Sequence, residues 1–256
     1  MINDIVDRNS DRQHPFKKNR PIASGKLPVH IAKFAAFSGI ILTLVFSFFL
    51  SPFLSLLAFA YFALQFAYSF YLKHIAILDV LTIAAGFMIR VYAGAVVVNL
   101  HMSVWFLLTV ISASLFIAVA KRQSERTLLS GLRGENKSFA TRKSLEKYST
   151  RLLDIYTGMF ANATWLTYAL FAFQHQIDVD NGAIPTLQSF LPRAFTAQKW
   201  LMLTVPIVIY IVMRYLQLVY EDNQGESPER VILRDKPLLA ASVFYAASIM
   251  VLLYFL

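Results

Sequence analysis

The sequence predicts an all-α membrane protein built as a bundle of transmembrane helices. The chain has 256 residues, of which 57% are hydrophobic and only 15% charged, and its mean hydropathy is +0.54. Soluble globular domains carry about 25% charged residues. Two further observations agree with a membrane protein: seven apolar runs are long enough to cross a bilayer, and Lys and Arg concentrate between alternate runs.

The apolar runs define the predicted spans. A helix needs roughly 20 mostly apolar residues to cross the hydrocarbon core of a bilayer. The runs that reach this length are 29–50, 52–72, 78–98, 102–120, 152–173, 200–219 and 237–256. We therefore expect one integral membrane domain over residues 1–256. We expect no cleavable signal peptide, because the first residues are charged and the first apolar run is too long.

Basic residues predict how the bundle is oriented. One face of the bundle carries 19 Lys and Arg residues in its connections, and the opposite face carries only 2. The basic face is formed by residues 1–28, 73–77, 121–151 and 220–236. Because cytoplasmic loops are enriched in Lys and Arg, we expect this face to lie on the cytoplasmic side of the cell inner (plasma) membrane.

The longest connection on the basic face is 121–151. We expect it to form a partly helical cytoplasmic cap that is broken at Gly131 and Gly134, since glycine is a frequent helix breaker. The other polar element of this face is the N-terminal segment 1–28. It holds carboxylates and cations close together.

Composition excludes several classes of function. There is no Cys, so disulfides, thiolate metal sites and a cysteine nucleophile are impossible. The five His residues lack zinc-site spacing, and no P-loop or nucleophile elbow is present. The net charge of +9 would suggest nucleic acid in a soluble protein. Here basic loops that face anionic lipid explain it, so we expect no nucleic-acid partner.

Three carboxylates near the N-terminus suggest a metal site. Asp4, Asp7 and Asp11 are three and four residues apart, which places them on one face of a helix. Asn3 adds a carbonyl oxygen beside them. Clustered carboxylates repel one another unless a cation lies between them, and oxygen ligands with incomplete protein coordination favour Mg²⁺. The predicted cofactor is therefore Mg²⁺ that also binds a substrate phosphate.

A basic loop follows these carboxylates. Its cations are Arg12, Lys17, Lys18 and Arg20. Pro15 and Pro21 stop a regular helix, so the loop can fold back over the carboxylates and bind phosphate oxygens. The alternative is a solvated juxtamembrane segment, which is what charge runs usually are.

Further polar residues lie at the same predicted face. Tyr68, Lys73 and Asp79 are at the cytoplasmic ends of two consecutive spans, although a lone lysine there is more often a snorkelling anchor. Arg90 lies deeper within a span, and an intramembrane arginine is a candidate for function because burying it is costly. Its alternative role is a structural ion pair with Asp79 or an N-terminal carboxylate.

The end of the fourth predicted span carries another group of charges. Lys121 and Arg122 are followed by Glu125. Lys121 and Glu125 are four residues apart and can pair along a helix. Their place on the basic face also makes Lys121 and Arg122 candidates for binding a diphosphate or a lipid phosphate.

The motifs resemble those of a known family. The stretch NDIVDRNSD is similar to the NDxxDxxxD signature of the UbiA superfamily of intramembrane prenyltransferases. Within it, the resemblance is greatest to the decaprenyl-phosphate phosphoribosyltransferases, whose H-P-x-K-x-x-R-P-I-A-S-G pattern matches HPFKKNRPIASG. YSFYLKHIAILDVLTIAAGFMIRVYAGA, KRQSE and GESPERVILRDKPLL resemble later segments of that group.

The resemblance implies a reaction and roles for residues. A polyprenyl phosphate attacks C1 of 5-phosphoribosyl 1-diphosphate and diphosphate leaves, giving a precursor for cell-wall arabinan. The catalytic carboxylates are then Asp4, Asp7 and Asp11, which together with Asn3 bind the metal and the diphosphate. The residues that bind substrate are then Arg12, Lys17, Arg20, Tyr68, Lys73, Arg90, Lys121 and Arg122. Membrane lipids are further expected partners, and assembly of several copies is left open.

The resemblance does not extend to the number of spans, and it leaves more than one function open. Members of the family have nine spans with the first motif after the second span, so seven of an expected nine are present here and two helices are expected to be missing. A second candidate function is that of a prenyltransferase that moves a prenyl group from a prenyl diphosphate to an aromatic acceptor. The absence of a second aspartate-rich run around Lys73 and Asp79 disfavours it. A transporter and an inactive truncated remnant are the non-catalytic hypotheses.

Overall fold

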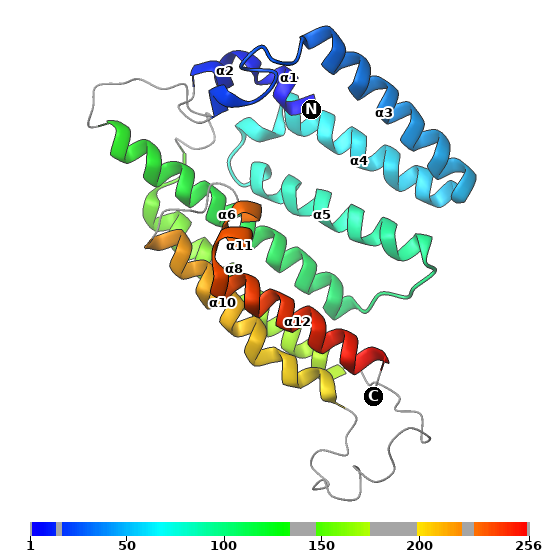
Figure 1. Cartoon of the computed structure of the whole chain (residues 1–256), viewed down its shortest axis with the longest axis vertical. Helices are drawn as coiled ribbons and strands as arrows, with labels where there is room; N and C mark the ends of the chain where they lie inside the picture. The colour runs from blue at the N-terminus through cyan, green and yellow to red at the C-terminus, as the bar shows by residue number, and fades with distance from the viewer. Residues whose placement is uncertain (1, 14–16, 134–146, 175–198, 222–227, 255–256) are drawn as a thin grey trace, which may run out of the picture. The chain divides into compact units, whose positions relative to one another are not determined.

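The computed structural model describes residues 2–13, 17–133, 147–174, 199–221 and 228–254, and these are helical, with short connections (Figure 1). Three short helices lie at the N-terminus: α1 (Ile2–Val6), α2 (Arg8–Gln13) and the 3₁₀ helix η1 (Lys17–Asn19). The longer elements that follow are α3 (Val29–Leu50), α4 (Pro52–Phe70), η2 (Leu72–His74), α5 (Leu78–Val97), α6 (Val104–Arg133), α8 (Thr150–Gln174), η3 (Trp200–Thr204), α10 (Val205–Tyr220), α11 (Pro228–Arg234) and α12 (Lys236–Tyr254).

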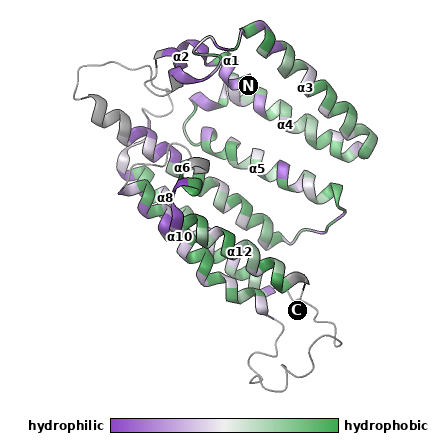
Figure 2. Ribbon diagram, in the orientation of Figure 1, coloured by the Kyte–Doolittle hydropathy of each residue, from purple (hydrophilic) through white to green (hydrophobic). Residues whose placement is uncertain are grey.

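The predicted fold class is confirmed. Helices form at all seven predicted spans, and five in the described part of the chain are long and apolar enough to cross a membrane: Val29–Leu50, Pro52–Phe70, Leu78–Val97, Val104–Thr127 and Trp200–Tyr220. α12 contributes a shorter apolar segment, Lys236–Leu252. α8 is long, but its threonines, Asn162 and Asp154 make it more polar. Figure 2 shows hydrophilic residues concentrated on α1 and α2 and hydrophobic residues along α3 and α4. The chain is an integral membrane protein.

The predicted helix break in the 121–151 connection is wrong at Gly131. α6 runs without interruption from Val104 to Arg133 and includes this glycine. A glycine inside a helix costs only about 1 kcal/mol relative to alanine, and a helix of this length propagates through such a position. Gly134 lies outside the described residues. The first part of the predicted cap is therefore an extension of the fourth span.

The chain forms two compact units. The first consists of Met1–Met102 with Leu128–Leu152, and the second of Ser103–Thr127 with Leu153–Leu256. In the first unit, α3, α4 and α5 lie side by side, and α1 contacts α3 and α4 at one end of them (Figure 1). Large apolar side chains on α3 remain exposed, Phe34 at 75% and Phe49 at 81%. Exposed apolar surface of this extent fits contact with lipid.

The second unit has its own apolar core. Phe116 of α6 packs edge to face on Tyr215 of α10, at 5.4 Å between ring centroids, and Leu218 and Leu238 are buried in the same cluster. Nearer the other end of these helices, the hydroxyl groups of Tyr168 and Thr204 hydrogen-bond at 2.5 Å. Because a buried polar group is costly without a partner, this pair satisfies both hydroxyls within the helix packing.

An ion pair fixes the start of α12. The Arg214 guanidinium donates to both carboxylate oxygens of Asp235, from Nε at 3.1 Å and from Nη2 at 2.6 Å. The same carboxylate accepts the backbone N–H of Leu238 at 2.8 Å and so caps the helix. The hydrogen bonds from Arg214 hold the pKa of Asp235 below its ordinary value of 3.8.

Removing this charge is expected to make the protein less stable only above acidic pH. A lowered pKa contributes stability that is complete above the ordinary value of 3.8 and is lost as the pH falls through the lowered pKa. Asp235→Asn keeps an acceptor for Leu238 but loses the charge, at a cost of about 1 kcal/mol near neutral pH. Thermal unfolding in detergent should show a lower melting temperature for Asp235→Asn than for wild type near neutral pH, and this difference should disappear in acid. A difference in melting temperature that stays constant in acid would contradict this. The matched control is Glu221→Gln, a carboxylate at the C-terminal end of α10.

Candidate active site

The three N-terminal carboxylates lie along one nearly continuous helical stretch. α1 and α2 are joined at Asp7, whose N–H donates to the carbonyl of Asn3 at 2.8 Å. The N–H of Asp11 donates in turn to the carbonyl of Asp7, also at 2.8 Å. These bonds have the i to i−4 spacing of an α-helix, so the predicted ladder of carboxylates is present.

The basic loop folds back onto two of these carboxylates. Nη1 of Arg20 donates to Oδ1 of Asp4 at 2.8 Å and to Oδ2 of Asp11 at 3.0 Å. Asp11 is buried, with 5% of its surface exposed. The fold-back predicted from the proline positions is therefore present, and one guanidinium nitrogen bridges two carboxylates.

Arg12 holds the loop from the other side. Its Nε donates to the carbonyl of Ala23 at 3.0 Å, which ties α2 to the loop end, and Ile22 and Ala23 are buried there. In the structure, the guanidinium of Arg12 therefore binds a backbone carbonyl of the same segment. Lys17 lies in η1, on the same loop as Arg20.

The third carboxylate contacts a buried lysine from a different part of the chain. Lys73 lies in η2, between α4 and α5, and only 2% of it is exposed. Its Nζ donates to Oδ1 of Asp7 at 2.5 Å, across a sequence separation of 66 residues. A buried ammonium group is strongly unfavourable without a carboxylate partner. Lys73 is therefore not a snorkelling anchor but part of the carboxylate site.

The turn after Lys73 contains a second buried acid. Asp79, in the first turn of α5, is fully buried, and its Oδ1 accepts the hydroxyl of Tyr148 at 2.8 Å. Tyr68, in the last turn of α4, is partly buried. The role of Tyr148 was not found from the sequence, because a single tyrosine in a polar connection carries no spacing signal that distinguishes it.

The oxygen ligands that this site offers fit a hard divalent cation. Asn3, Asp4, Asp7 and Asp11 offer only oxygen ligands, which is what Mg²⁺ takes. The Oδ1 atom of Asn3 is buried and has no hydrogen-bond partner. Among the described residues, however, no three acidic or histidine side chains converge into a ready cluster for a metal. Arg20 and Lys73 pair with the carboxylates instead, so a metal would have to replace part of these ion pairs.

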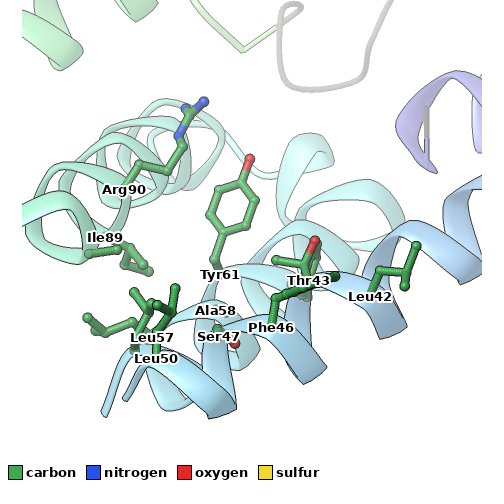
Figure 3. A pocket seen from close by; sticks show the side chains of 13 residues that line it. Leu42, Thr43, Phe46, Ser47, Leu50, Leu57, Ala58, Tyr61, Ile89 and Arg90 are labelled. Atoms are coloured by element: carbon green, nitrogen blue, oxygen red, sulfur yellow. The ribbon is translucent and has the colours of Figure 1, made fainter. Parts of the chain in front are cut away.

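Arg90 lies apart from the carboxylates, on α5. Its Nε donates to the carbonyl of Gly86 at 3.1 Å, and its guanidinium lies over the rings of Phe87 and Tyr61, at 4.4 and 5.4 Å from their centroids. These contacts favour an arginine held by aromatic rings over the alternative ion pair with Asp79. Figure 3 shows Arg90 next to Tyr61 beside a groove between α3, α4 and α5. The groove measures about 530 Å³ and is otherwise mainly apolar.

The charges at the end of the fourth span lie in the second unit. Arg122 is almost fully buried, with 1% exposed, and its Nη1 donates to Oε2 of Glu125 at 2.7 Å. The sequence offered Lys121, four residues away, as a partner for Glu125, and the structure shows an ion pair between Glu125 and Arg122, three residues away. Spacings of three and four both bring helical side chains together, and the planar guanidinium of Arg122 suits a desolvated ion pair.

A neighbouring polar cluster was not predicted. Oδ1 of Asp154 accepts the amide of Gln123 at 2.7 Å and the hydroxyl of Tyr220 at 3.0 Å. The other amide atom of Gln123, Oε1, and the hydroxyl of Ser124 are buried without a hydrogen-bond partner. Three helices, α6, α8 and α10, supply these residues, so no local sequence pattern could have revealed the cluster.

The chain is similar to known proteins over most of its length. The UbiA prenyltransferase family matches residues 1–234. A decaprenyl-phosphate phosphoribosyltransferase of Mycolicibacterium smegmatis is 34% identical over 255 residues, which is 100% of this chain and 76% of that protein. The one from Corynebacterium glutamicum is 32% identical over 99% of this chain and 71% of its own length. Nodulation protein NoeC of Azorhizobium caulinodans is 31% identical over 50% of this chain and 42% of its own length.

Proposed function

Because the chain belongs to the UbiA prenyltransferase family, we propose that it transfers a 5-phosphoribosyl group from 5-phosphoribosyl 1-diphosphate to a polyprenyl phosphate such as decaprenyl phosphate. A phosphate oxygen of the lipid forms a bond to C1 of the ribose, and the bond from C1 to the diphosphate breaks. The leaving diphosphate carries away the electron pair. The product is a lipid-linked phosphoribose of the kind needed for cell-wall arabinan.

The observation that carries this proposal is the arrangement of charges around the N-terminal carboxylates. Two cations, Arg20 and Lys73, are drawn from separate segments onto Asp4, Asp11 and Asp7. A reaction that expels diphosphate develops negative charge on the leaving oxygens, and fixed cations nearby stabilise it. The nucleophile is already an anion, so the site needs no strong general base.

A divalent metal fits the same site in this proposal. Asn3, Asp4, Asp7 and Asp11 would hold Mg²⁺, which supplies charge neutralisation for the diphosphate when bound. Arg20 and Lys73 would then turn from the carboxylates to the phosphate oxygens of the substrates. Tyr68, at the end of α4 close in sequence to Lys73, is the proposed hydroxyl donor to a phosphate.

The remaining candidates have supporting roles. Lys17, on the loop that carries Arg20, and Arg12, in α2, would add positive charge around the phosphoribosyl diphosphate. Lys121 and Arg122 would bind a phosphate of either substrate, and Arg90 would contact substrate from α5. The Lys and Arg distribution supports an active site on the cytoplasmic face of the plasma membrane, with the lipid tail in the bilayer.

An assay with two competing donors tests the proposal. Membranes containing the chain receive labelled phosphoribosyl diphosphate with polyprenyl phosphate, and in parallel a labelled prenyl diphosphate with an aromatic acid, each with and without Mg²⁺. We expect label to enter the lipid fraction only in the first mixture and only with the metal. Transfer of the prenyl group alone would replace this proposal with prenyl transfer to an aromatic acceptor.

Removing the bridging guanidinium is expected to weaken donor binding. Arg20→Ala takes away a cation that bridges Asp4 and Asp11. A hydrogen bond to a charged group contributes about 1.5–3 kcal/mol, so we expect KM for phosphoribosyl diphosphate to rise roughly 10- to 100-fold. Lys26→Ala, an exposed cation on the same segment, is the matched control and should leave KM unchanged. Equal KM values for Arg20→Ala and wild type would remove Arg20 from the donor site.

A further inference from the structure

We propose that Tyr148 is a positioning residue that holds the turn between η2 and α5 in a strained conformation and thereby keeps Lys73 against Asp7. The effect of Tyr148 on catalysis rests on the proposed function, because the proposed function makes Lys73 a ligand of the substrate phosphates. It adds a residue from the 121–151 connection to a site otherwise built from the N-terminal segment and the turn between α4 and α5.

The Tyr148 hydroxyl makes two hydrogen bonds to this turn. It donates to Oδ1 of Asp79 at 2.8 Å and accepts the backbone N–H of Ile77 at 2.6 Å. Only 2% of Tyr148 is exposed, and Asp79 is fully buried. A tyrosine hydroxyl has one hydrogen to donate and lone pairs to accept, and both capacities are used here. The side chain is therefore held in the interior with its polar end bonded to the turn.

Ile77 has a backbone conformation that isoleucine rarely adopts. Its φ is 73° and its ψ is −50°, close to the γ-turn with positive φ, which is rare and strained. A β-branched residue is especially unfavourable there. Such a residue persists only where its surroundings hold it, and this kind of strain is concentrated at functional sites. The hydroxyl of Tyr148 provides a holding contact for the peptide group of Ile77.

The strained residue also begins α5. The N–H groups of Val80 and Leu81 both donate to the carbonyl of Ile77, at 3.1 and 2.9 Å. The N–H of Ile77 lies before the first helical turn and has no carbonyl partner within α5, so it needs one from elsewhere. Tyr148 supplies it. Without the hydroxyl, the partly buried N–H of Ile77 would lose its acceptor, and a change in the conformation of the turn would become more favourable.

A change in the conformation of this turn would shift Lys73, which lies only a few residues before it. Only three residues separate Lys73 from Ile77, and η2 is tied to them by the bond from the N–H of Ile75 to the carbonyl of Leu72 at 3.1 Å. Lys73 itself is buried and contacts Asp7. A change of φ at Ile77 therefore moves the short segment that presents the ammonium group.

Chemical labelling of Lys73 tests the proposal without any assay of activity. The full chain in detergent is treated with an amine-acetylating reagent, and labelling of each lysine is followed by mass spectrometry. In Tyr148→Phe we expect Lys73 to be labelled at least about fivefold faster, which corresponds to loss of the hydrogen bond from the Ile77 N–H alone. The exposed Lys26 and Lys33 should be labelled at wild-type rates. Labelling of Lys73 at the wild-type rate in Tyr148→Phe would overturn the proposal.

A rescue variant separates positioning from general packing. Glycine adopts positive φ without strain, and Ile77 is 52% exposed, so Ile77→Gly removes little packing. We expect Ile77→Gly to return Lys73 of Tyr148→Phe to slow labelling, and the single variant Ile77→Gly to keep it slow. Absence of rescue would show that the hydroxyl does not act through the strain at Ile77, and would overturn that part of the proposal. Tyr168→Phe, which removes another buried and bonded hydroxyl, is the control and should leave Lys73 unchanged.

Kinetics then connect the labelling to catalysis. In Tyr148→Phe we expect KM for phosphoribosyl diphosphate to rise about fivefold with a smaller change in kcat, and Ile77→Gly to reverse it. If the wild-type chain transfers no phosphoribose, the proposed function fails while the labelling result still decides the role of Tyr148. If the wild-type chain is active and Tyr148→Phe changes labelling but not KM, Tyr148 positions Lys73 without consequence for the donor, and the catalytic part of the inference is overturned.

Discussion

Asp4→Asn is expected to abolish most metal-dependent release of diphosphate, lowering the rate roughly 10²- to 10³-fold, the size of effect seen when one preorganised electrostatic group is lost from a reacting centre. The amide keeps the shape of the side chain but loses the charge that would bind Mg²⁺ and that pairs with Arg20 at 2.8 Å. Because the Asp4 side chain is 33% exposed, the variant should fold normally. Diphosphate release from phosphoribosyl diphosphate in membranes with polyprenyl phosphate measures the effect.

Two comparisons make the Asp4→Asn result interpretable. Asp235→Asn changes a carboxylate to the same amide at a structural ion pair in the second unit, and it should retain the activity of the folded protein. Raising the Mg²⁺ concentration should recover part of the activity of Asp4→Asn if the lost group is a metal ligand. Diphosphate release by Asp4→Asn at the wild-type rate would refute the assignment of the N-terminal carboxylates.

Lys73→Met is expected to destabilise the protein and remove its activity at the same time. The Lys73 side chain is 3% exposed and that of its partner Asp7 is 15% exposed. Removing one member of a buried ion pair costs about 3–5 kcal/mol, because the other charge is left without compensation. Thermal unfolding in detergent measures the stability, and the transfer assay measures the loss of the phosphate-binding cation.

The double variant Asp7→Asn/Lys73→Met separates these two effects. With both charges removed, no uncompensated charge remains, so most of the lost stability should return. Activity should not return, because both the proposed metal ligand and the proposed phosphate ligand are gone. A double variant that is active would show that the pair has only a structural role, and a stable Lys73→Met single variant would show that Asp7 has further compensation.

The carboxylate ladder and the loop that covers it were predictable because they depend on neighbours in the chain. Spacings of three and four fix Asp4, Asp7 and Asp11 on one side of a helical stretch whatever the rest of the fold does. Pro15 and Pro21 interrupt regular helix in the loop, so Arg20 can fold back to the nearby carboxylates. Family resemblance added the reaction and the phosphate ligands, which spacing alone does not provide.

The partners of individual charges were less predictable. Arg90 was predicted as a functional candidate, with an ion pair to a carboxylate as the alternative, and its guanidinium lies over the rings of Phe87 and Tyr61. For Glu125 the sequence offered Lys121 as a partner, and the structure shows an ion pair with Arg122. In both cases more than one contact was compatible with the spacing, so the sequence did not decide which contacts form. The continuation of α6 through Gly131 has a similar reason, since a modest local penalty is outweighed in a long helix.

The sequence by itself determined that this protein is a helical membrane protein, where its helices lie, and that carboxylates and cations meet near its N-terminus. These properties depend on composition and on residues within a few positions of one another. Only the tertiary structure decided that Lys73 contacts Asp7 across 66 residues and that Tyr148 reaches Asp79 across 69. Such contacts depend on how helices pack, because side chains far apart in the chain meet only where the fold brings their backbones together.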